Sequence, residues 1–302
     1  MPRWLALLVS VVIAAGLVRP AEAAGVCPKI DVRRELNLLL PAYIYPSESE
    51  PFASLWTRIL ADVAIARKVG FKVVVIVNPE NGEFRATNAD YTRIIDRLDA
   101  AGASVIGYVH SSYGHRSAAG IVADIERYGR FYPKVRGIFV DEAQLDLLHV
   151  DYHMTLRRAA IRAFGGTAFV VANSPGVQLS DPRHREIFDL TVAYEDIESH
   201  LAGFAQQRMV KDAEPNRIAY IVNAIDKTRS DAQQQAAACE IARSLRLSAR
   251  DRRNAGYWFL TTDRGDVPGS ITDNNAYDTL GTAHEAFLQA TCWINSLRPC
   301  PR

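Results

Sequence analysis

Gly-Ile-Phe-Val-Asp-Glu, at residues 137–142, joins a short run suited to a buried strand to two adjacent carboxylates. Near-continuous apolar runs of this kind, without strict alternation, are typical of parallel strands that are covered on both faces. In proteins built from such strands, functional side chains gather at the carboxyl ends. This stretch therefore predicts a parallel β-structure and also the place of its chemistry.

Similar apolar runs flank this stretch on both sides along the chain. Together they predict strands over residues 36–45, 72–78, 104–110, 136–141, 168–173, 190–195, 217–223 and 256–262. Amphipathic helical segments lie between them, and strand–helix alternation repeated in this way is the signature of a (β/α)₈ barrel. We therefore predict an α/β protein with a single-domain TIM barrel over residues 24–302. An open doubly wound sheet is disfavoured because no Gly-rich phosphate turn follows the first strand. The sequence there is Pro41-Ala42-Tyr43 instead.

Local signals place the helices. Asn88 is expected to cap one helix and Gly102 to end it, and Gly165-Gly166 is expected to end another. The segment near residues 182–187 predicts a short fifth helix. Trp56 and Trp293 fall on apolar helix faces and Trp258 inside the last strand, so we expect all three in the core.

The first residues predict export. Arg3 gives a positive start, residues 5–18 are almost entirely apolar, and Ala21-Glu22-Ala23 offers small residues to a signal peptidase. The apolar run is too short for a comfortable membrane span, and no second run of spanning length follows. We predict a signal peptide over residues 1–23 and a periplasmic or extracellular mature protein without stable membrane insertion. An uncleaved N-terminal anchor is the alternative.

Charge and cysteine content restrict the partners and the covalent links. The formal net charge is +1, and without residues 1–23 the chain is neutral and has no basic run. This balance predicts no nucleic-acid partner, and we expect a monomer. Four cysteines in an exported chain favour two disulfides. Because the ends of a barrel lie close together, the pairing we favour is Cys27–Cys300 with Cys239–Cys292, although the other pairings stay open.

The predicted strand ends are rich in acids, amides and aromatic residues. Sugar sites use this combination, because rings stack on aromatic faces and hydroxyls need hydrogen-bond donors and acceptors. Tyr113 and Arg116 follow the third strand, where ligand contact and bracing of the loop are equally compatible with the sequence. The predicted sugar contacts are Tyr43, Tyr45, Asn78, Tyr108, His110, Tyr113, Arg116, Asn173 and Asp263.

Asp141, Glu142 and Glu195 are the predicted catalytic acids. The first two end the fourth strand and Glu195 ends the sixth, so the barrel is expected to bring them to one rim. Like charges beside a dry core raise the pKa of at least one carboxyl. Glycoside hydrolysis needs such a split, with one carboxylate ionised and another protonated. The alternative is structural: Asp141 or Glu142 would pair with Arg116 or cap the next helix.

Other chemistries find little support in the sequence. His110 is the one histidine at a predicted strand end, so we predict no metal site and no cofactor. A Gly-x-Ser-x-Gly elbow, the signature of many serine hydrolases, does not occur.

Several ordered motifs make the chain similar to a known family. In the second half of the barrel the match to this family is looser and consists of Asn173, Tyr194-Glu195 and Thr262-Asp263. The long motifs occupy residues 38–46, 77–79, 107–116, 124–133 and 137–142. On these motifs the chain resembles the spherulin-4-like glycoside hydrolases, the spherulation-specific family 4. Two loops depart from the family pattern, at residues 80–84 and at Asn173-Ser174-Pro175-Gly176.

The resemblance implies a barrel that cleaves α-1,4-linked exopolysaccharide containing N-acetylgalactosamine, such as a biofilm polymer. It also implies that the three acids carry the reaction. Our hypothesis is an endo-acting, retaining hydrolase in which Asp141 is the nucleophile, Glu195 the general acid/base, and Glu142 tunes the pair or binds the sugar. The alternatives are a non-catalytic carbohydrate-binding barrel and a metal-dependent deacetylase.

Overall fold

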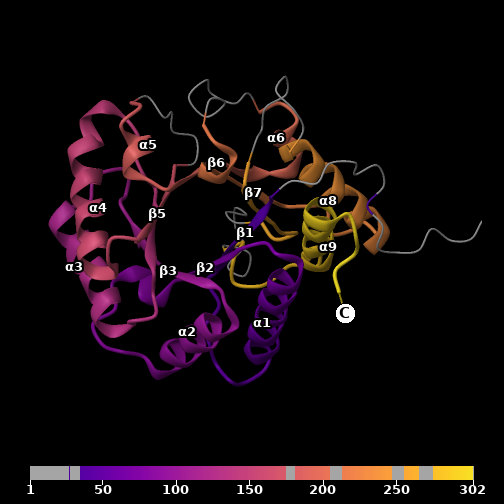
Figure 1. The fold of residues 1–302 in the computed structure, drawn as a ribbon, viewed down its shortest axis with the longest axis horizontal. Coiled ribbons are helices and arrows are strands. Elements are labelled where there is room, and N and C mark those ends of the chain that lie inside the picture. Colours follow the sequence, from indigo (N-terminus) through magenta and orange to yellow (C-terminus); the bar gives the residue numbers. More distant parts are fainter. Residues whose placement is uncertain are drawn as a thin grey trace, which may run out of the picture.

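The strands of this protein close into a barrel. The computed structural model describes Cys27 and residues 35–174, 181–204, 213–246, 255–264 and 275–301. Each strand pairs in parallel with the next, and β8 pairs with β1, so the sheet has no edge (Figure 1). This arrangement confirms the predicted (β/α)₈ fold and excludes the open sheet. The predicted signal peptide at residues 1–23 lies outside the described residues.

Each predicted run contains one strand. Most strands are shorter than predicted, because the tightly paired part of the barrel ends before the loop residues begin. There are two exceptions: β3 has the predicted bounds, and β6 continues two residues beyond Glu195. The strands are β1 (Asn37–Ala42), β2 (Val73–Val77), β3 (Ser104–His110), β4 (Gly137–Asp141), β5 (Phe169–Asn173), β6 (Leu190–Ile197), β7 (Ile218–Asn223) and β8 (Tyr257–Leu260).

Helices surround the barrel (Figure 1). The side chain of Asn88 accepts hydrogen bonds at the start of α2, and Gly102 ends it with φ 103°, as predicted. The helix after β5 is short, also as predicted. The described α-helices are α1 (Phe52–Val69), α2 (Ala89–Ala101), α3 (Ala118–Phe131), α4 (Val150–Phe164), α5 (His184–Ile187), α6 (Glu198–Leu201), α8 (Asp231–Arg246) and α9 (His284–Ser296). Short 3₁₀ helices are η1 (Pro79–Gly82), η2 (Leu147–His149) and η3 (Pro215–Arg217).

The core fills the barrel and the layer between the strands and helices. Trp56 and Trp258 are buried, and Trp293 is partly buried against the core, as their positions predicted. Gly137 starts β4 because a Cβ there would overlap the carbonyl oxygen of Phe169 on the neighbouring strand. Close packing of β4 against β5 therefore requires a glycine at position 137.

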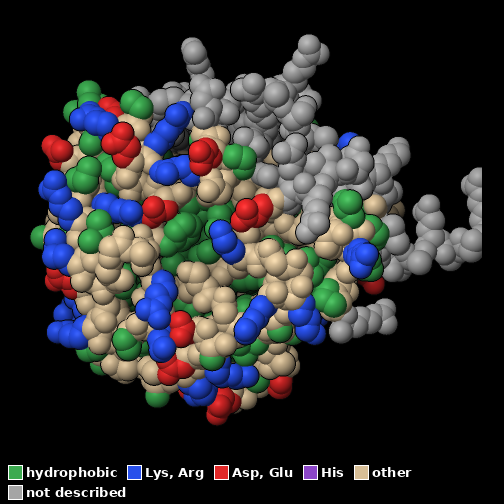
Figure 2. Space-filling model, in the orientation of Figure 1, with side chains coloured by type: hydrophobic (Ala, Val, Ile, Leu, Met, Phe, Trp, Pro, Cys, Tyr) green, Lys and Arg blue, Asp and Glu red, His purple; other side chains and the backbone are tan. Residues whose placement is uncertain are grey.

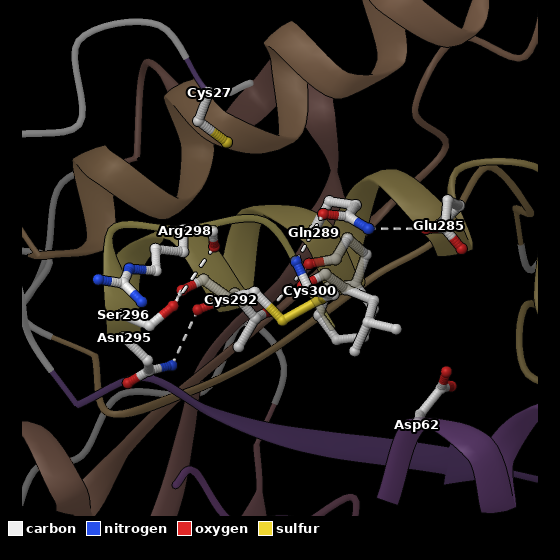
Figure 3. The surroundings of a disulfide bond; sticks show 12 residues. Cys27, Asp62, Glu285, Gln289, Cys292, Asn295, Ser296, Arg298 and Cys300 are labelled. Atoms are coloured by element: carbon white, nitrogen blue, oxygen red, sulfur yellow. Dashed lines mark hydrogen bonds between the residues drawn. A yellow bond between two sulfur atoms is a disulfide. The ribbon is translucent and has the colours of Figure 1, made fainter. Parts of the chain in front are cut away.

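The disulfide pairing we favoured from the sequence is wrong. The disulfides are Cys27–Cys239 and Cys292–Cys300. The chain turns back after α9 at Leu297, whose φ is 56°, and brings Cys300 to 5.3 Å from Cys292 between Cα atoms (Figure 3). Cys27 lies instead against α8. The first and last strands of the barrel are paired, but the local turn brings Cys300 to Cys292, so Cys27 bonds to Cys239.

A buried polar pair joins the first and last described helices. Asp62 of α1 is 1% exposed and His284 of α9 is 4% exposed. Their side chains meet with Oδ2 2.5 Å from Nε2. The pair lies where α9 packs beside α1 and completes the ring of helices (Figure 1). We therefore expect it to support closure of the barrel.

A second buried pair consists of two histidines. His153 Nδ1 of α4 lies 3.1 Å from His184 Nε2 of α5, and both residues are buried. Burial, followed by the neighbouring His184, lowers the pKa of His153 from 6.5 to about 3. Burial also lowers the pKa of His184. Both rings are thus neutral near pH 7.

This pair predicts loss of stability in acid. Between pH 6.5 and about 3, the unfolded chain protonates His153 and the folded chain does not. Protons therefore favour unfolding, and His153 alone should lower the unfolding free energy by about 1.4 kcal/mol per pH unit in this window. Chemical denaturation at pH 7 and pH 5 should show a smaller loss for His153→Asn than for wild type. The exposed His115→Asn should behave like wild type; equal losses in all three proteins would contradict the assignment.

Charged side chains are spread over the visible surface. Figure 2 shows acidic and basic groups interspersed around one face, with hydrophobic side chains nearer its centre. Among the described residues, no helix is both long and apolar enough to span a bilayer.

Candidate active site

A cleft of about 770 Å³ opens at the carboxyl ends of the strands, where side chains from strand ends and loops converge. Three of its four acids are those predicted from the sequence. It is lined by Tyr43, Asn78, Asn81, Tyr108, Tyr113, Asp141, Glu142, Glu195, Asp196, Ile197, Asn223, Arg264, Asn275, Ala276 and Tyr277.

Asp141 is held by several donors at the end of β4. Its Oδ1 accepts hydrogen bonds from Asn173 Nδ2 at 2.8 Å and from the backbone N–H of Glu142 at 2.9 Å. Its Oδ2 accepts one from the Tyr108 hydroxyl at 2.8 Å. Donors to a carboxylate stabilise its negative charge and fix its orientation. Asp141 is therefore held in a fixed orientation facing the cleft.

Glu195 faces the same space from β6. Its Oε1 accepts a hydrogen bond from the Tyr277 hydroxyl, and its Oε2 accepts one from Asn173 Nδ2 at 2.5 Å. The register of β6 against β7 shifts between Val192 and Tyr194, directly before Glu195. Such irregularities change the direction of a side chain and recur beside active sites.

Asn173 connects the two acids. Its single amide nitrogen donates to Asp141 Oδ1 at 2.8 Å and to Glu195 Oε2 at 2.5 Å. Because both oxygens bond to one atom, they lie within about 5 Å of each other. Asn173 is 2% exposed and its position is set by β5, so the separation of the acids depends on the barrel itself.

Glu142 occupies a strained turn. Its φ of 53° lies in the left-handed region, which non-glycine residues adopt at a cost. Its carbonyl oxygen accepts hydrogen bonds from Ser111 Oγ at 2.7 Å and from the backbone of Tyr113 at 2.9 Å, and these hold the turn. Its carboxylate lies 3.9 Å from His110 Nδ1 and remains partly exposed at the cleft.

Three tyrosine rings form one wall of the cleft. Tyr43 lies between Tyr108 and Tyr277, with ring centroids 5.3 Å from each and edge-on geometry. Burial raises the pKa of all three phenols, and the charges of Asp141 and Glu195 raise them further. The phenols therefore stay protonated at neutral pH and can act as hydrogen-bond donors.

The structure brings four of the nine predicted sugar contacts to the lining of the cleft and leaves the other five outside it. Tyr43, Asn78, Tyr108 and Tyr113 line it. Tyr45 turns toward α2, where its hydroxyl donates to Asp90 at 2.9 Å.

Asp263, after β8, accepts a hydrogen bond from Thr279 and is also outside the lining. His110 and Arg116 belong to a network beside the cleft. His110 Nδ1 lies 3.0 Å from Ser112 Oγ, and its Nε2 lies 3.4 Å from Glu83 Oε1. Arg116 donates to the His110 carbonyl at 3.1 Å and pairs with the buried Asp124. Of the two interpretations of Arg116, these contacts favour bracing of the loop.

The loop at residues 80–84, which departs from the family pattern, packs closely against the site. Glu80 and Asn81 have φ values of 49° and 53°, and Asn81 lines the cleft. Gly82 has φ 82°, and a Cβ there would overlap the carbonyl oxygen of Tyr108. This loop therefore shapes one side of the cleft. In the other loop that departs from the family pattern, at residues 173–176, residues 175 and 176 lie outside the described residues.

Sequence reasoning missed several cleft residues. Asn223 ends β7 just as Asn173 ends β5, so the strand-end rule could have found it. Tyr277 lies in a loop beyond β8 and carries no strand-end signal. Arg264 and Asp196 also line the cleft. Burial acts to raise the pKa of Asp196, but hydrogen bonds from His200 and the backbone of Ile197, with the charges of His200 and Arg264, lower it overall.

Comparisons with known proteins agree with the sequence motifs. The family model of spherulation-specific family 4 matches residues 37–291. Spherulin-4 of Physarum polycephalum is 34% identical over 167 residues, which cover 55% of this chain and 46% of that protein. The match thus spans less than half the length of this curated relative.

Solved structures share the fold. Aspergillus clavatus Sph3, in complex with GalNAc, has a TM-score of 0.64 and 20% identity and covers 85% of this chain and 98% of its own. A GH138 enzyme targeting pectin rhamnogalacturonan II has a TM-score of 0.53 and 10% identity over 88% of this chain and 40% of its own. Since the family model covers most of the barrel, the chain belongs to spherulation-specific family 4.

Proposed function

We propose that this protein is an endo-acting glycoside hydrolase that cleaves α-1,4-linked polysaccharide containing N-acetylgalactosamine or galactosamine. The observation that carries the proposal is the bridge made by Asn173 between Asp141 and Glu195 in one open cleft. The GalNAc bound to the structurally similar Sph3 supports an amino-sugar substrate. The family resemblance supports the linkage.

The spacing of the acids favours a retaining mechanism. Retaining glycosidases hold their two carboxyl groups about 5–5.5 Å apart, whereas inverting enzymes need roughly 6.5–9.5 Å to admit a water molecule. Asp141 Oδ1 and Glu195 Oε2 share one donor nitrogen, so these oxygens lie within about 5 Å of each other, closer than an inverting pair requires. A nucleophile and an acid/base are therefore the roles that fit best.

In the first step, Asp141 attacks the anomeric carbon while Glu195 gives its proton to the departing glycosidic oxygen. The bond between sugar and leaving group breaks as the bond to Asp141 forms. In the second step, ionised Glu195 takes a proton from water, whose oxygen replaces Asp141 at the anomeric carbon. Asp141 suits the first role because three donors orient it without neutralising it.

The remaining groups bind the sugar chain. The ring of Tyr43 lies between the tyrosines that hold the two acids, and its side chain lines the cleft. Its phenol is therefore placed to meet a sugar hydroxyl. Glu142 and Asn78 offer further acceptors around the same space. Two disulfides support an exported protein that meets such a polymer outside the cytoplasm.

Reducing-end release tests the proposal. De-branched α-1,4-linked N-acetylgalactosamine and galactosamine polymers should yield new reducing ends and shorter oligosaccharides with wild-type protein at a pH between about 4 and 8. An α-1,4-linked glucan, which lacks the amino sugar, serves as the control substrate and should not be cleaved. Binding of the amino-sugar polymers without release at any pH would favour a non-catalytic carbohydrate-binding barrel.

A further inference from the structure

Tyr277 contacts a proposed catalytic acid from a loop beyond the last strand. The loop is fixed to the barrel, because the backbone N–H of Tyr43 donates to the Tyr277 carbonyl at 3.0 Å. The Thr262 hydroxyl accepts from the backbone of Thr282 at 2.8 Å, and a Cβ on Gly281 would be crowded by Thr261. The position of the Tyr277 ring is thus set by the rim of the barrel.

Hydrogen bonding gives the Tyr277 hydroxyl a direction. The Asn223 amide nitrogen donates to the phenol oxygen at 3.1 Å. An amide nitrogen can only donate, so the one phenol proton is left for Glu195, to which Tyr277 donates. The chain of hydrogen bonds from Asn223 through Tyr277 to Glu195 therefore ends with a phenol that donates to the carboxylate.

We infer that Tyr277, oriented by Asn223, is a positioning residue that holds Glu195 and stabilises its ionised form. This inference rests on the proposed function. The ionised form is the one that activates water in the second step, while the protonated form acts in the first. Tyr277 and Asn173 hold opposite oxygens of the carboxylate, so together they fix its rotation in the cleft.

The described groups of the cleft act on Glu195 in different ways. A carboxylate at Asp141, the nucleophile of the proposed function, would oppose ionisation of its neighbour. The Tyr108 hydroxyl is committed to Asp141. Among the described residues, Tyr43, Tyr108, Tyr113 and Tyr277 interact electrostatically with Glu195, and Asp141, Glu142, Asp196 and Arg264 line the same cleft.

Tyr277→Phe tests the inference through the pH profile. Loss of the donor makes ionisation of Glu195 less favourable, so the alkaline limb of kcat/KM should move to higher pH by about one unit. Asn223→Ala should move the limb in the same direction by less. Tyr132→Phe is the matched control, because its hydroxyl accepts from the backbone N–H of Asn88 and the residue does not line the cleft. Its limb should stay in place.

An unchanged alkaline limb in folded Tyr277→Phe would overturn the inference, even if the rate fell. If Tyr277→Phe does not fold, an unchanged limb in Asn223→Ala has the same meaning. Should wild type release no reducing ends, the proposed function fails separately. The Glu195 carboxyl can then be titrated by ¹³C NMR, with its signal identified by Glu195→Gln. An upward move of that titration in Tyr277→Phe would still support the hydrogen-bond role, and no move would refute it.

Discussion

Asp141→Asn is expected to lower kcat/KM on the amino-sugar polymer by about 10⁴-fold while leaving the fold intact. The amide has nearly the shape of the carboxylate and can still accept from Tyr108, which donates to Asp141 at 2.8 Å in the native site. It lacks the negative charge that attacks the anomeric carbon and balances the developing oxocarbenium ion. Initial rates of reducing-end release would measure the loss of activity, and a circular dichroism melt would show whether the fold is intact.

Asp146→Asn is the matched control for this substitution. Asp146 follows the same strand, and its carboxylate accepts from the backbone of Leu148 at 2.9 Å outside the cleft lining. This variant should keep rates near those of wild type. A folded Asp141→Asn that retains a tenth or more of the native rate would remove Asp141 from the nucleophile's role.

Asp62→Ala is expected to lower the free energy of unfolding by about 3–5 kcal/mol. The carboxylate is 1% exposed, and its loss would leave His284 buried without the partner that lies 2.5 Å away. A cavity between α1 and α9 would add to the loss. Guanidinium denaturation at pH 7, with the disulfides intact, would measure it.

Two variants sharpen this stability test. Asp96→Ala replaces an exposed aspartate of α2 and should stay within about 0.5 kcal/mol of wild type. Asp62→Leu combined with His284→Leu should recover much of the loss, because an apolar pair of suitable volume can replace a buried polar pair. A loss below about 1 kcal/mol for Asp62→Ala would mean that the pair does not support barrel closure.

The fold could be predicted from the sequence because its signals are local. Apolar runs marked all eight strands, which the closed barrel confirms, and single residues such as Asn88 and Gly102 marked helix ends. The three acids could be placed at one rim because barrel topology brings strand ends together whatever their distance along the chain. The resemblance to spherulation-specific family 4 is likewise confirmed by the family match.

What the sequence could not supply depends on the course of loops in space. Tyr277 reaches Glu195 from a loop whose path no periodicity describes. Tyr45 has the same residue type and neighbourhood as Tyr43, yet it turns outward to Asp90. The disulfide prediction failed for the same reason, since a left-handed turn at Leu297 decides where Cys300 goes.

The central proposal is that Asp141 forms a covalent bond to the sugar while Glu195 handles the proton. Intact-protein and peptide mass spectrometry, after incubation with a 5-fluoro-N-acetylgalactosaminyl fluoride that slows the second step, tests it most directly. We expect the mass of one sugar on the peptide that contains Asp141, and no such mass on Asp141→Asn. Turnover of the polymer by wild type with no adduct, or an adduct on a different residue that survives Asp141→Asn, would contradict it.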